Sequence, residues 1–493
     1  MRIDKYRKML YNLRMVKNSV KIYDCVIIGG GVIGAFTARE LAKFGGRFML
    51  LEAGNDVSVG ASKANSGIVH AGFDAEPGTL KAKFNVAGNR LMSLKCIDLE
   101  VPYVPNGALV LAFDDGGMRT LKELKARGIA NGVDTEIISG EAARKIESAL
   151  SDKVVGALYA HSSGIVSPYE LTIACYENYI ANGGAAEFNR RVVKIERAAE
   201  GYKITAKSDD GNHVYYARTV VNAAGAFSDE INNMVCSHKR KISPRRGQYM
   251  LLDRKVRPVV QRTIFQTPTA LGKGVLVTPT CHNNTVVGPS AEDISDKTDK
   301  ATTYQGLESV FDCARLSVPT LSKRDIITQF SGVRAVCGDD FEIGEAEDGF
   351  FNALGICSPG LASSPAIGEY LATKIAEKLN LDENKNFNGI RHAIPCFAGA
   401  TDREVTALIR QDPRYGNIIC RCEQVTEGEI VEAIRRGAVD LDGVKRRVRA
   451  GMGRCQAGFC TPKLISIIAR ELNISPEQVT KHGKGSEIIG DGQ

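Results

Sequence analysis

A glycine-rich turn between an apolar run and a helical stretch constrains this chain more than any other feature. Residues 24–34 read Asp-Cys-Val-Ile-Ile-Gly-Gly-Gly-Val-Ile-Gly, and apolar residues then recur at helical spacing up to Phe44. Residues 47–51 read as a second strand, which ends at the acid Glu52. Strand, glycine turn, helix, strand and acid in this order predict a doubly wound α/β domain that binds a dinucleotide, with Glu52 hydrogen-bonded to the adenosine ribose.

The glycines of this turn have separate physical tasks. Gly29 permits the tight turn, Gly31 lets the backbone approach a pyrophosphate, and Gly34 lets the helix pack closely on the strand. Val32 and Ile33 follow the turn and begin the helix, whose N-terminal amides attract the pyrophosphate. The turn alone does not separate FAD from NAD.

Three later segments favour FAD. Residues 60–73 are small and polar, as in a loop that lies against a flat cofactor, and residues 219–229 form a buried strand that ends in small residues. Residues 355–368 form a glycine turn that opens a helix, whose N-terminus can stabilise the negative charge of a reduced flavin. The predicted FAD contacts in these segments are Ser62, Asn65, Ser66, Gly67, Ala224, Gly225, Gly360, Leu361 and Ala362.

Taken together, these segments resemble the FAD-dependent superfamily of D-amino-acid oxidase and glycerol-3-phosphate dehydrogenase, over residues 22–395. The resemblance implies a doubly wound FAD domain that is interrupted in sequence by an antiparallel β-sheet covering the substrate. Short β-prone stretches at residues 259–266, 275–279 and 285–288 fit such a sheet. Further matching phrases lie at residues 164–168, 244–249, 274–280 and 331–334.

The chain is long enough for several domains. We expect a basic extension (1–21), a discontinuous FAD domain (22–95, 145–240 and 335–395), a substrate domain (96–144 and 241–334), a linker (396–410), a small helical [2Fe-2S] domain (411–480) and a tail (481–493).

Four cysteines near the C-terminal end form a pattern, C-x-C, 32 residues, then C-x4-C: Cys420, Cys422, Cys455 and Cys460. Four thiolates are the usual ligand set of a [2Fe-2S] cluster. A structural zinc site and unconnected thiols are alternatives, although zinc sites more often use C-x2-C pairs. The segment also resembles the bacterioferritin-associated-ferredoxin type of [2Fe-2S] domain, which implies that these four residues bind the cluster. That domain on this type of flavoprotein is a feature of anaerobic glycerol-3-phosphate dehydrogenases.

Oxidation of an alcohol at a flavin requires a base and an anchor for the substrate. His70 lies in the cofactor loop and is our candidate base, although it could equally be a structural hydrogen-bond partner of the flavin. Arg334 is the candidate anion anchor, because a guanidinium holds a carboxylate or phosphate through two parallel hydrogen bonds; a surface ion pair is its alternative role. Arg246, Gln248 and Tyr249 are candidate substrate contacts or structural residues.

The resemblance implies oxidation of a small anionic alcohol, with sn-glycerol 3-phosphate as the leading substrate and dihydroxyacetone phosphate as the product. Electrons would pass through the cluster to an external acceptor, which could be a partner flavoprotein, a ferredoxin-like protein or a quinone. Residues 65–73 and 77–83 look more like the L-2-hydroxyglutarate branch, so that substrate is an alternative. An electron-transfer subunit without its own substrate and an amine oxidase are further alternatives.

Charge and cysteine usage narrow the partners and the compartment. Lys and Arg number 64 against 57 Asp and Glu, giving +7, and residues 1–21 supply 7 − 1 = +6 of this excess. The rest of the chain is close to neutral, which argues against nucleic acid as a partner. The basic extension could contact a membrane peripherally or be superfluous. The other nine of 13 cysteines have no pairing pattern, as expected in the cytoplasm. We expect a cytoplasmic protein, with contact at the inner membrane face and oligomer formation left open.

Overall fold

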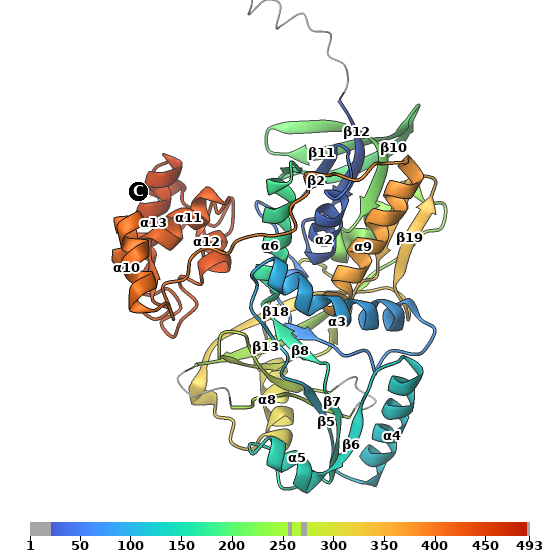
Figure 1. Ribbon diagram of the computed structural model, residues 1–493, viewed down its shortest axis with the longest axis vertical. Helices are drawn as coiled ribbons and strands as arrows, with labels where there is room; N and C mark the ends of the chain where they lie inside the picture. Colours follow the sequence, from blue (N-terminus) through green and yellow to red (C-terminus); the bar gives the residue numbers. More distant parts are fainter. Residues whose placement is uncertain (1–20, 255–258, 268–273, 491–493) are drawn as a thin grey trace, which may run out of the picture.

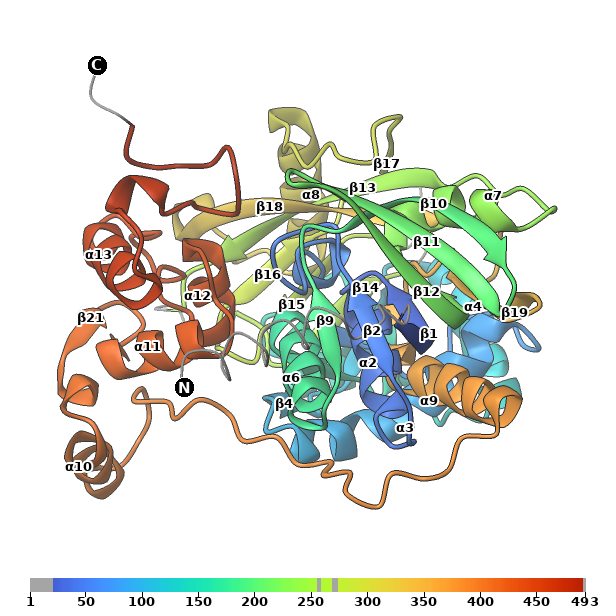
Figure 2. The ribbon, with the colours of Figure 1, turned by 90° about the horizontal axis from the view of Figure 1, so that it is seen from above.

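In a computed structural model, the structure describes residues 21–254, 259–267 and 274–490. Two large sheets and a small helical C-terminal module make up this part of the chain, and the module lies to one side of the sheets (Figures 1 and 2). The expected basic extension falls outside the described residues, except for Lys21. None of the described helices is long and apolar enough to cross a membrane.

The first sheet has eight strands and is centred on β1 (Ile22–Ile28), which pairs in parallel with β2 (Phe48–Leu51) and β12 (Gly211–Asn222). Both faces of β1 are buried: Cys25 and Ile27 pack against helices, whereas Val26 and Ile28 pack mainly against residues of neighbouring strands. The turn after β1 therefore opens at the carboxyl edge of the sheet, where α/β proteins bind ligands. The other strands are β9 (Ala185–Glu187), β10 (Arg191–Ala198), β11 (Gly201–Ser208), β19 (Glu342–Glu347) and β20 (Phe350–Leu354).

Two helices from distant parts of the sequence, α2 (Val32–Leu41) and α9 (Gly360–Leu379), pack together in this domain. A Cβ atom on Gly368 would lie 2.8 Å from Cβ of Phe36, so the helices approach closely only because Gly368 has no side chain. The discontinuous doubly wound domain of the prediction is confirmed by this packing. Its remaining helices are α3 (Leu80–Asp98), α6 (Pro168–Ala181) and α7 (Ser228–Val235).

The second sheet has nine strands and is mostly antiparallel. Its strands β14 (Thr263–Gln266), β15 (Leu276–Pro279) and β16 (Thr285–Gly288) coincide with the three β-prone stretches of the sequence. Helices α4 (Asp115–Ala130), α5 (Gly140–Ile146) and α8 (Tyr304–Ser317) cover it. The other strands are β5 (Ala108–Ala112), β6 (Glu136–Ser139), β7 (Gly156–Ala160), β13 (Ser243–Leu252), β17 (Glu292–Asp293) and β18 (Ile326–Val336).

One predicted boundary needs correction. Strand β7 pairs with β5 and β6 in the second sheet, although residues 145–240 were assigned to the FAD domain. The second sheet therefore continues to about residue 160. A short apolar strand does not reveal from its own sequence which sheet it joins, since its partners lie elsewhere in the chain. A small third sheet contains three short strands, in the order β3 (Ile68–Val69), β8 (Gly164–Val166) and β4 (Tyr103–Val104).

The C-terminal module has its own hydrophobic core, formed among others by Val431, Val444 and Ile468. Its first helix, α10 (Asp402–Gln411), lies within residues 396–410, which we expected to be a linker. This helix buries none of its residues, although Val405, Leu408 and Ile409 recur at helical spacing and Thr401 and Glu404 form a capping box at its start. The module continues with β21 (Ile418–Cys420), β22 (Val425–Thr426), α11 (Glu427–Arg435), α12 (Leu441–Val448) and α13 (Thr461–Leu472).

Candidate flavin site and cysteine module

A cavity of about 2080 Å³ lies between the two large sheets, at the carboxyl edge of β1 and β2. Segments from the whole length of the flavoprotein meet around it, including the glycine turn, the loop after β2 and the start of α9. Most of the predicted FAD contacts line it: Gly29, Gly31, Val32, Ile33, Glu52, Ser62, Asn65, Ser66, Ala224, Gly225, Gly360 and Leu361. Gly34, Gly67 and Ala362 lie behind this lining, where they pack against neighbouring backbone.

The glycine turn leaves no room for side chains at two positions. Gly29 has φ +111°, and a Cβ atom there would lie 2.4 Å from the carbonyl oxygen of Ala223. A Cβ atom on Gly34 would lie 1.9 Å from the carbonyl oxygen of Gly29. These contacts let β1, α2 and the end of β12 meet without side chains between them, which keeps backbone amides at the cavity wall.

Glu52 and Ser62 hold the polar end of the cavity in place. The amides of Gly30 and Gly54 donate to the two carboxylate oxygens of Glu52, at 2.6 and 2.7 Å. Burial raises the pKa of Glu52, and these amide hydrogen bonds only partly oppose that effect. The amide of Val32 donates to Ser62 Oγ at 2.8 Å. An acidic acceptor and a helix N-terminus thus share one end of the cavity, as an adenosine ribose next to a pyrophosphate requires.

The start of α9 forms another part of the wall. Cys357, Ser358, Gly360 and Leu361 line the cavity there. This 20-residue helix directs its N-terminal amides toward the cavity, in the manner predicted for the negative end of a reduced flavin. The residues present therefore fit FAD, with Glu52 and α2 at one end of the cavity and α9 at another.

His70 lies where both large sheets contribute to the cavity. Its backbone carbonyl accepts hydrogen bonds from Asn85 (2.7 Å) and Asn89 (3.1 Å), which fix the loop. Its ring stacks on Phe265 of the second sheet with centroids 5.7 Å apart, and its Nε2 lies 3.5 Å from Ser358 Oγ. The imidazole thus lies between the start of α9 and the substrate sheet, within reach of a molecule that contacts both.

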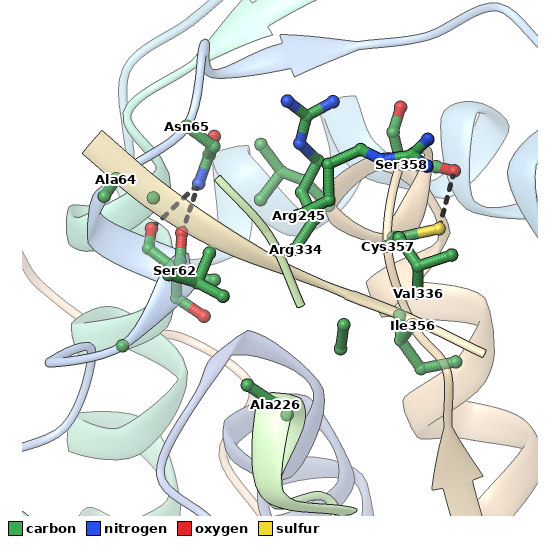
Figure 3. Close-up of a pocket in the computed structure, with 18 of the residues that line it drawn as sticks. Ser62, Ala64, Asn65, Ala226, Arg245, Arg334, Val336, Ile356, Cys357 and Ser358 are labelled. Atoms are coloured by element: carbon green, nitrogen blue, oxygen red, sulfur yellow. Dashed lines mark hydrogen bonds between the residues drawn. The ribbon is translucent and has the colours of Figure 1, made fainter. Parts of the chain in front are cut away.

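Two arginines face each other across the strands that border the cavity. Arg334 on β18 lies opposite Arg245 on β13, and both side chains line the cavity (Figure 3). Arg334 Nη2 donates to the carbonyl oxygen of Ser290 at 2.5 Å, while its buried Nε has no hydrogen-bond partner among the described residues. Arg245 forms two bonds to Asp293, at 2.6 and 3.0 Å. Asp293 thus binds Arg245, whereas Arg334 binds a neutral carbonyl oxygen, and like charges at facing strand positions are destabilising without a further anion.

The structure does not bring Arg246 into the cavity. Its side chain points to the other face of β13 and forms ion pairs with Glu292 (2.8 Å) and Asp299 (2.6 Å). Successive side chains of a strand alternate between its faces, so the neighbour Arg245 takes the cavity position. Arg245 was not predicted from the sequence. It is identified in the structure by its pairing with Arg334 on the neighbouring strand.

Gln248 and Tyr249, the other candidate substrate contacts, line the cavity, and each also has a structural contact. Gln248 Oε1 accepts a hydrogen bond from the amide of Thr303 at 2.7 Å, which fixes the start of α8. Tyr249 stacks on Phe330 with ring centroids 5.0 Å apart.

The four cysteines of the C-terminal module come together in two pairs. Sγ of Cys422 lies 3.6 Å from Sγ of Cys455, and Cys420 is hydrogen-bonded to Cys460. The Cys460 thiol and the amide of Gly451 lower the pKa of Cys420 to about 6. Among the described residues no three His, Cys, Asp or Glu side chains surround one point suited to a single metal ion. Two thiol pairs fit two irons with two thiolates each better than one zinc ion with four.

Buried ion pairs fix the module to the flavoprotein. Asp56, in the loop after β2, accepts hydrogen bonds from Arg446 (2.6 Å) and Arg447 (2.7 and 2.9 Å) on α12. All three side chains are at most 5% exposed. Burial alone would raise the pKa of Asp56, but the two arginines outweigh it and lower this pKa below the ordinary value of 3.8.

The loops that carry the cysteines contact helix α6 and the segment that follows β13. Arg449 donates to Glu423 (2.9 Å), beside Cys422, and to the hydroxyl of Tyr169 (3.1 Å) on α6. Arg254, which follows β13, donates to the carbonyl oxygen of Cys422 at 2.6 Å. The cysteine module is thus held against the flavoprotein by contacts at the cysteine loops themselves.

Comparisons with known proteins agree with this architecture. The model of the FAD dependent oxidoreductase family matches residues 24–374, and that of the BFD-like [2Fe-2S] binding domain matches residues 418–470. A glycerol 3-phosphate dehydrogenase from Caloramator mitchellensis is 49% identical over 477 residues, covering 95% of this chain and 98% of the relative. A mitochondrial L-2-hydroxyglutarate dehydrogenase from Caenorhabditis briggsae is 33% identical over 300 residues, covering 58% of this chain and 68% of that relative.

A solved structure shares the fold of the flavoprotein part. The dithionite-reduced, FAD-bound L-alpha-glycerophosphate oxidase of Mycoplasma pneumoniae superposes with a TM-score of 0.71 at 28% identity. It covers 76% of this chain, and all of that chain is matched. The family model matches most of the sequence, and the fold and the lining of the cavity agree with it. This chain therefore belongs to the FAD dependent oxidoreductases and carries a BFD-like [2Fe-2S] domain at its C-terminal end.

Proposed function

We propose that this enzyme oxidises sn-glycerol 3-phosphate to dihydroxyacetone phosphate and passes the electrons through its [2Fe-2S] domain to an external acceptor. The reaction removes two electrons and two protons from a secondary alcohol that carries a phosphate. The near full-length similarity to a glycerol 3-phosphate dehydrogenase supports this substrate. The FAD-bound oxidase of similar fold is named for L-alpha-glycerophosphate, which is also a glycerol phosphate.

The facing arginines are the observation that carries the proposal. Arg334 and Arg245 place two guanidinium groups at the cavity. Arg245 is paired with Asp293, and the Nε of Arg334 has no hydrogen-bond partner among the described residues. A phosphate dianion can accept hydrogen bonds from both groups and offset their mutual repulsion. Arg334 is thus the principal anchor of the substrate phosphate, and Arg245 its second donor.

His70 is the base of the proposed reaction. Its imidazole, between Ser358 and Phe265, accepts the proton of the substrate hydroxyl while the phosphate is held by Arg334. Bound FAD would supply the acceptor for the hydride from the carbinol carbon. Phe265 and Tyr249 contribute apolar surface to the cavity, which limits access of water to the reacting atoms.

L-2-hydroxyglutarate is the second candidate substrate. It is also an anionic secondary alcohol, and a carboxylate suits a guanidinium as well as a phosphate does. Residues 65–73 resemble that branch, and a dehydrogenase for this substrate is among the relatives. That similarity extends over 58% of the chain, whereas the similarity to the glycerol 3-phosphate enzyme extends over 95%.

Anaerobic mixing of the holoenzyme with each substrate tests the proposal. We expect glycerol 3-phosphate to bleach the flavin absorbance within the dead time or in a fast single phase, and L-2-hydroxyglutarate to bleach it at least tenfold more slowly. Proline and lactate serve as controls for amine and hydroxyacid oxidation. The reverse order of rates would assign the enzyme to the hydroxyglutarate substrate, and no bleaching by any compound would favour an electron-transfer subunit.

A further inference from the structure

The loops that carry the cysteines also present exposed side chains directly beside the sulfurs. Arg421 lies between Cys420 and Cys422, Arg454 precedes Cys455, and Phe459 precedes Cys460. Phe459 is 86% exposed, more than any other large apolar side chain in the described part of the chain. An isolated exposed apolar residue is ordinary on a surface, but this one adjoins a predicted cluster ligand and is flanked by cations.

Within the two cysteine loops, every exposed charged side chain is positive. Residues 418–424 and 451–466 contain a single carboxylate, Glu423, which is buried and accepts hydrogen bonds from Arg449 and Arg254. Lys463, at the start of α13, adds a third exposed cation. Arg454 has a carboxylate neighbour, Asp253, at 3.6 Å, yet it stays 61% exposed. We call Arg421, Arg454, Phe459 and Lys463 the cysteine-loop face.

The cysteine loops have two differently used sides. One side contacts the flavoprotein, where Arg254 binds the carbonyl oxygen of Cys422 and Arg449 binds Tyr169. The cysteine-loop face carries the side chains that remain exposed, with Arg454 at its border, next to Asp253 of the flavoprotein. The module stands to one side of the two large sheets (Figure 2). Half-buried Cys422 and Cys455 place the edge of the thiol set close to the surface. Electrons that reach the cluster from the flavin can therefore leave over a short distance.

We propose that the cysteine-loop face docks an acidic protein that carries a single-electron redox centre near its own surface. The inference rests on the proposed function, because it assigns the exit of the electrons. Complementary charge steers such short-lived encounters, and an exposed aromatic ring gives them a central apolar contact. Each encounter transfers one electron from the reduced cluster to the oxidised centre of the carrier, and no proton. Two encounters complete the oxidation of one substrate molecule.

Stopped-flow mixing tests the docking separately from the substrate. The holoenzyme is reduced with dithionite, freed of excess reductant, and mixed with the acidic haem protein cytochrome b5 or with the basic haem protein cytochrome c. We expect a second-order rate with cytochrome b5 that falls steeply as ionic strength rises. Lys463→Glu and Arg421→Glu should lower that rate at low salt by about tenfold or more, since steering changes rates by 10- to 1000-fold. The same variants should accelerate cytochrome c.

Phe459→Ala should slow cytochrome b5 reduction at both low and high salt, because the apolar contact is not screened. Arg410→Glu, an exposed charge reversal on α10 of the same module, is the matched control and should leave the rate within twofold. The visible spectrum of the cluster shows whether each variant retains the cluster. If Arg421→Glu loses the cluster, Lys463→Glu alone tests the charge. Calorimetric binding of oxidised cytochrome b5 gives a readout that is independent of turnover.

Unchanged cytochrome b5 rates and binding in cluster-loaded Lys463→Glu and Phe459→Ala would overturn the docking proposal. The proposal would also be overturned if the native protein reacted faster with cytochrome c than with cytochrome b5 at low salt and if charge reversal changed neither rate. Failure of glycerol 3-phosphate to bleach the flavin would instead contradict the proposed function alone, because electrons enter from dithionite in this experiment.

Discussion

Arg334 on β18 and Arg245 on β13 occupy facing positions of one antiparallel ladder, with both guanidinium groups at the same cavity. Cations placed in this way lower stability unless an anion joins them. The enzyme retains this arrangement beside the loop of His70, where an anionic substrate would react.

Replacement of Arg334 by alanine should raise KM for glycerol 3-phosphate about 10- to 100-fold, since a hydrogen bond to a charged group contributes about 1.5 to 3 kcal/mol. Arg334→Lys should recover only part of this loss, because an ammonium lacks the planar fork. Steady-state kinetics with an artificial dye measure both. The exposed Arg324→Ala, in the turn just before β18, is the control and should keep the native KM. A native KM in Arg334→Ala would exclude the anchor role.

His70→Ala should slow flavin reduction by substrate about 100- to 10,000-fold, the usual contribution of a general base. Photoreduction of the flavin should stay normal, because it needs no base for the substrate. Single-turnover absorbance at saturating substrate measures the rate. The exposed His161→Ala is the matched control. A variant that reduces at the native rate but loses FAD more readily would give His70 the structural role instead.

Cys455→Ser should abolish the cluster spectrum without slowing flavin bleaching by substrate. Steady-state turnover with a one-electron protein acceptor should fall at least tenfold, because electrons then lack their exit. Cys396→Ser, an exposed cysteine outside the four-residue pattern, should change neither measurement. Equal loss of bleaching and turnover in Cys455→Ser would indicate that the cluster has a structural role.

Asp56→Asn should weaken the attachment of the module by about 3 to 5 kcal/mol, because buried Arg446 loses its counterion and buried Arg447 keeps only Glu177, at 3.9 Å. Limited proteolysis between α9 and α10 should become faster, and flavin to cluster electron transfer slower. Asp209→Asn removes a carboxylate from an exposed ion pair with Lys484 and should have little effect. Native protease resistance in Asp56→Asn would contradict this account of the interface.

The same contact predicts how attachment of the module depends on pH. The pKa of Asp56 is lower in the folded protein than its ordinary value of 3.8, so the ion pairs contribute fully above about pH 4. Their contribution is lost as the pH falls below 3.8 toward the folded pKa. Thermal unfolding between pH 3 and pH 6 should therefore show a steeper acid loss in the native protein than in Asp56→Asn. Parallel curves for the two proteins would contradict this linkage.

Features encoded by neighbouring residues were predictable from the sequence. The glycine turn with Gly29 and Gly34 needs only a strand and a helix on either side, and the spacing of Cys420 and Cys422 is equally local. The face of a strand on which a side chain lies was harder to predict. Arg246 was predicted at the site where Arg245 lies, because a shift of one residue moves a side chain to the other face of the strand. Strand β7 was given to the wrong domain for a related reason, since its sheet is fixed by partners far along the chain.

Contacts between the two ends of the chain could not be predicted at all. Asp56 and Arg447 are 391 residues apart, and each reads by itself as an ordinary charged surface residue. Helix α10, by contrast, was predictable, because Val405, Leu408 and Ile409 recur at helical spacing behind the capping box of Thr401 and Glu404.

Asp56 lies four residues after Glu52, in the loop whose Gly54 amide binds the Glu52 carboxylate. One short loop therefore serves two recognition events, the adenosine end of the cofactor on one side and the arginines of α12 on the other. If FAD orders this loop for the module, the module must order it for FAD by the same factor, because coupling between two binding events is reciprocal. Loss of FAD would then weaken attachment of the module, and removal of the module would weaken FAD binding by the same factor. Loading with flavin would therefore be a step in assembling the electron-transfer chain.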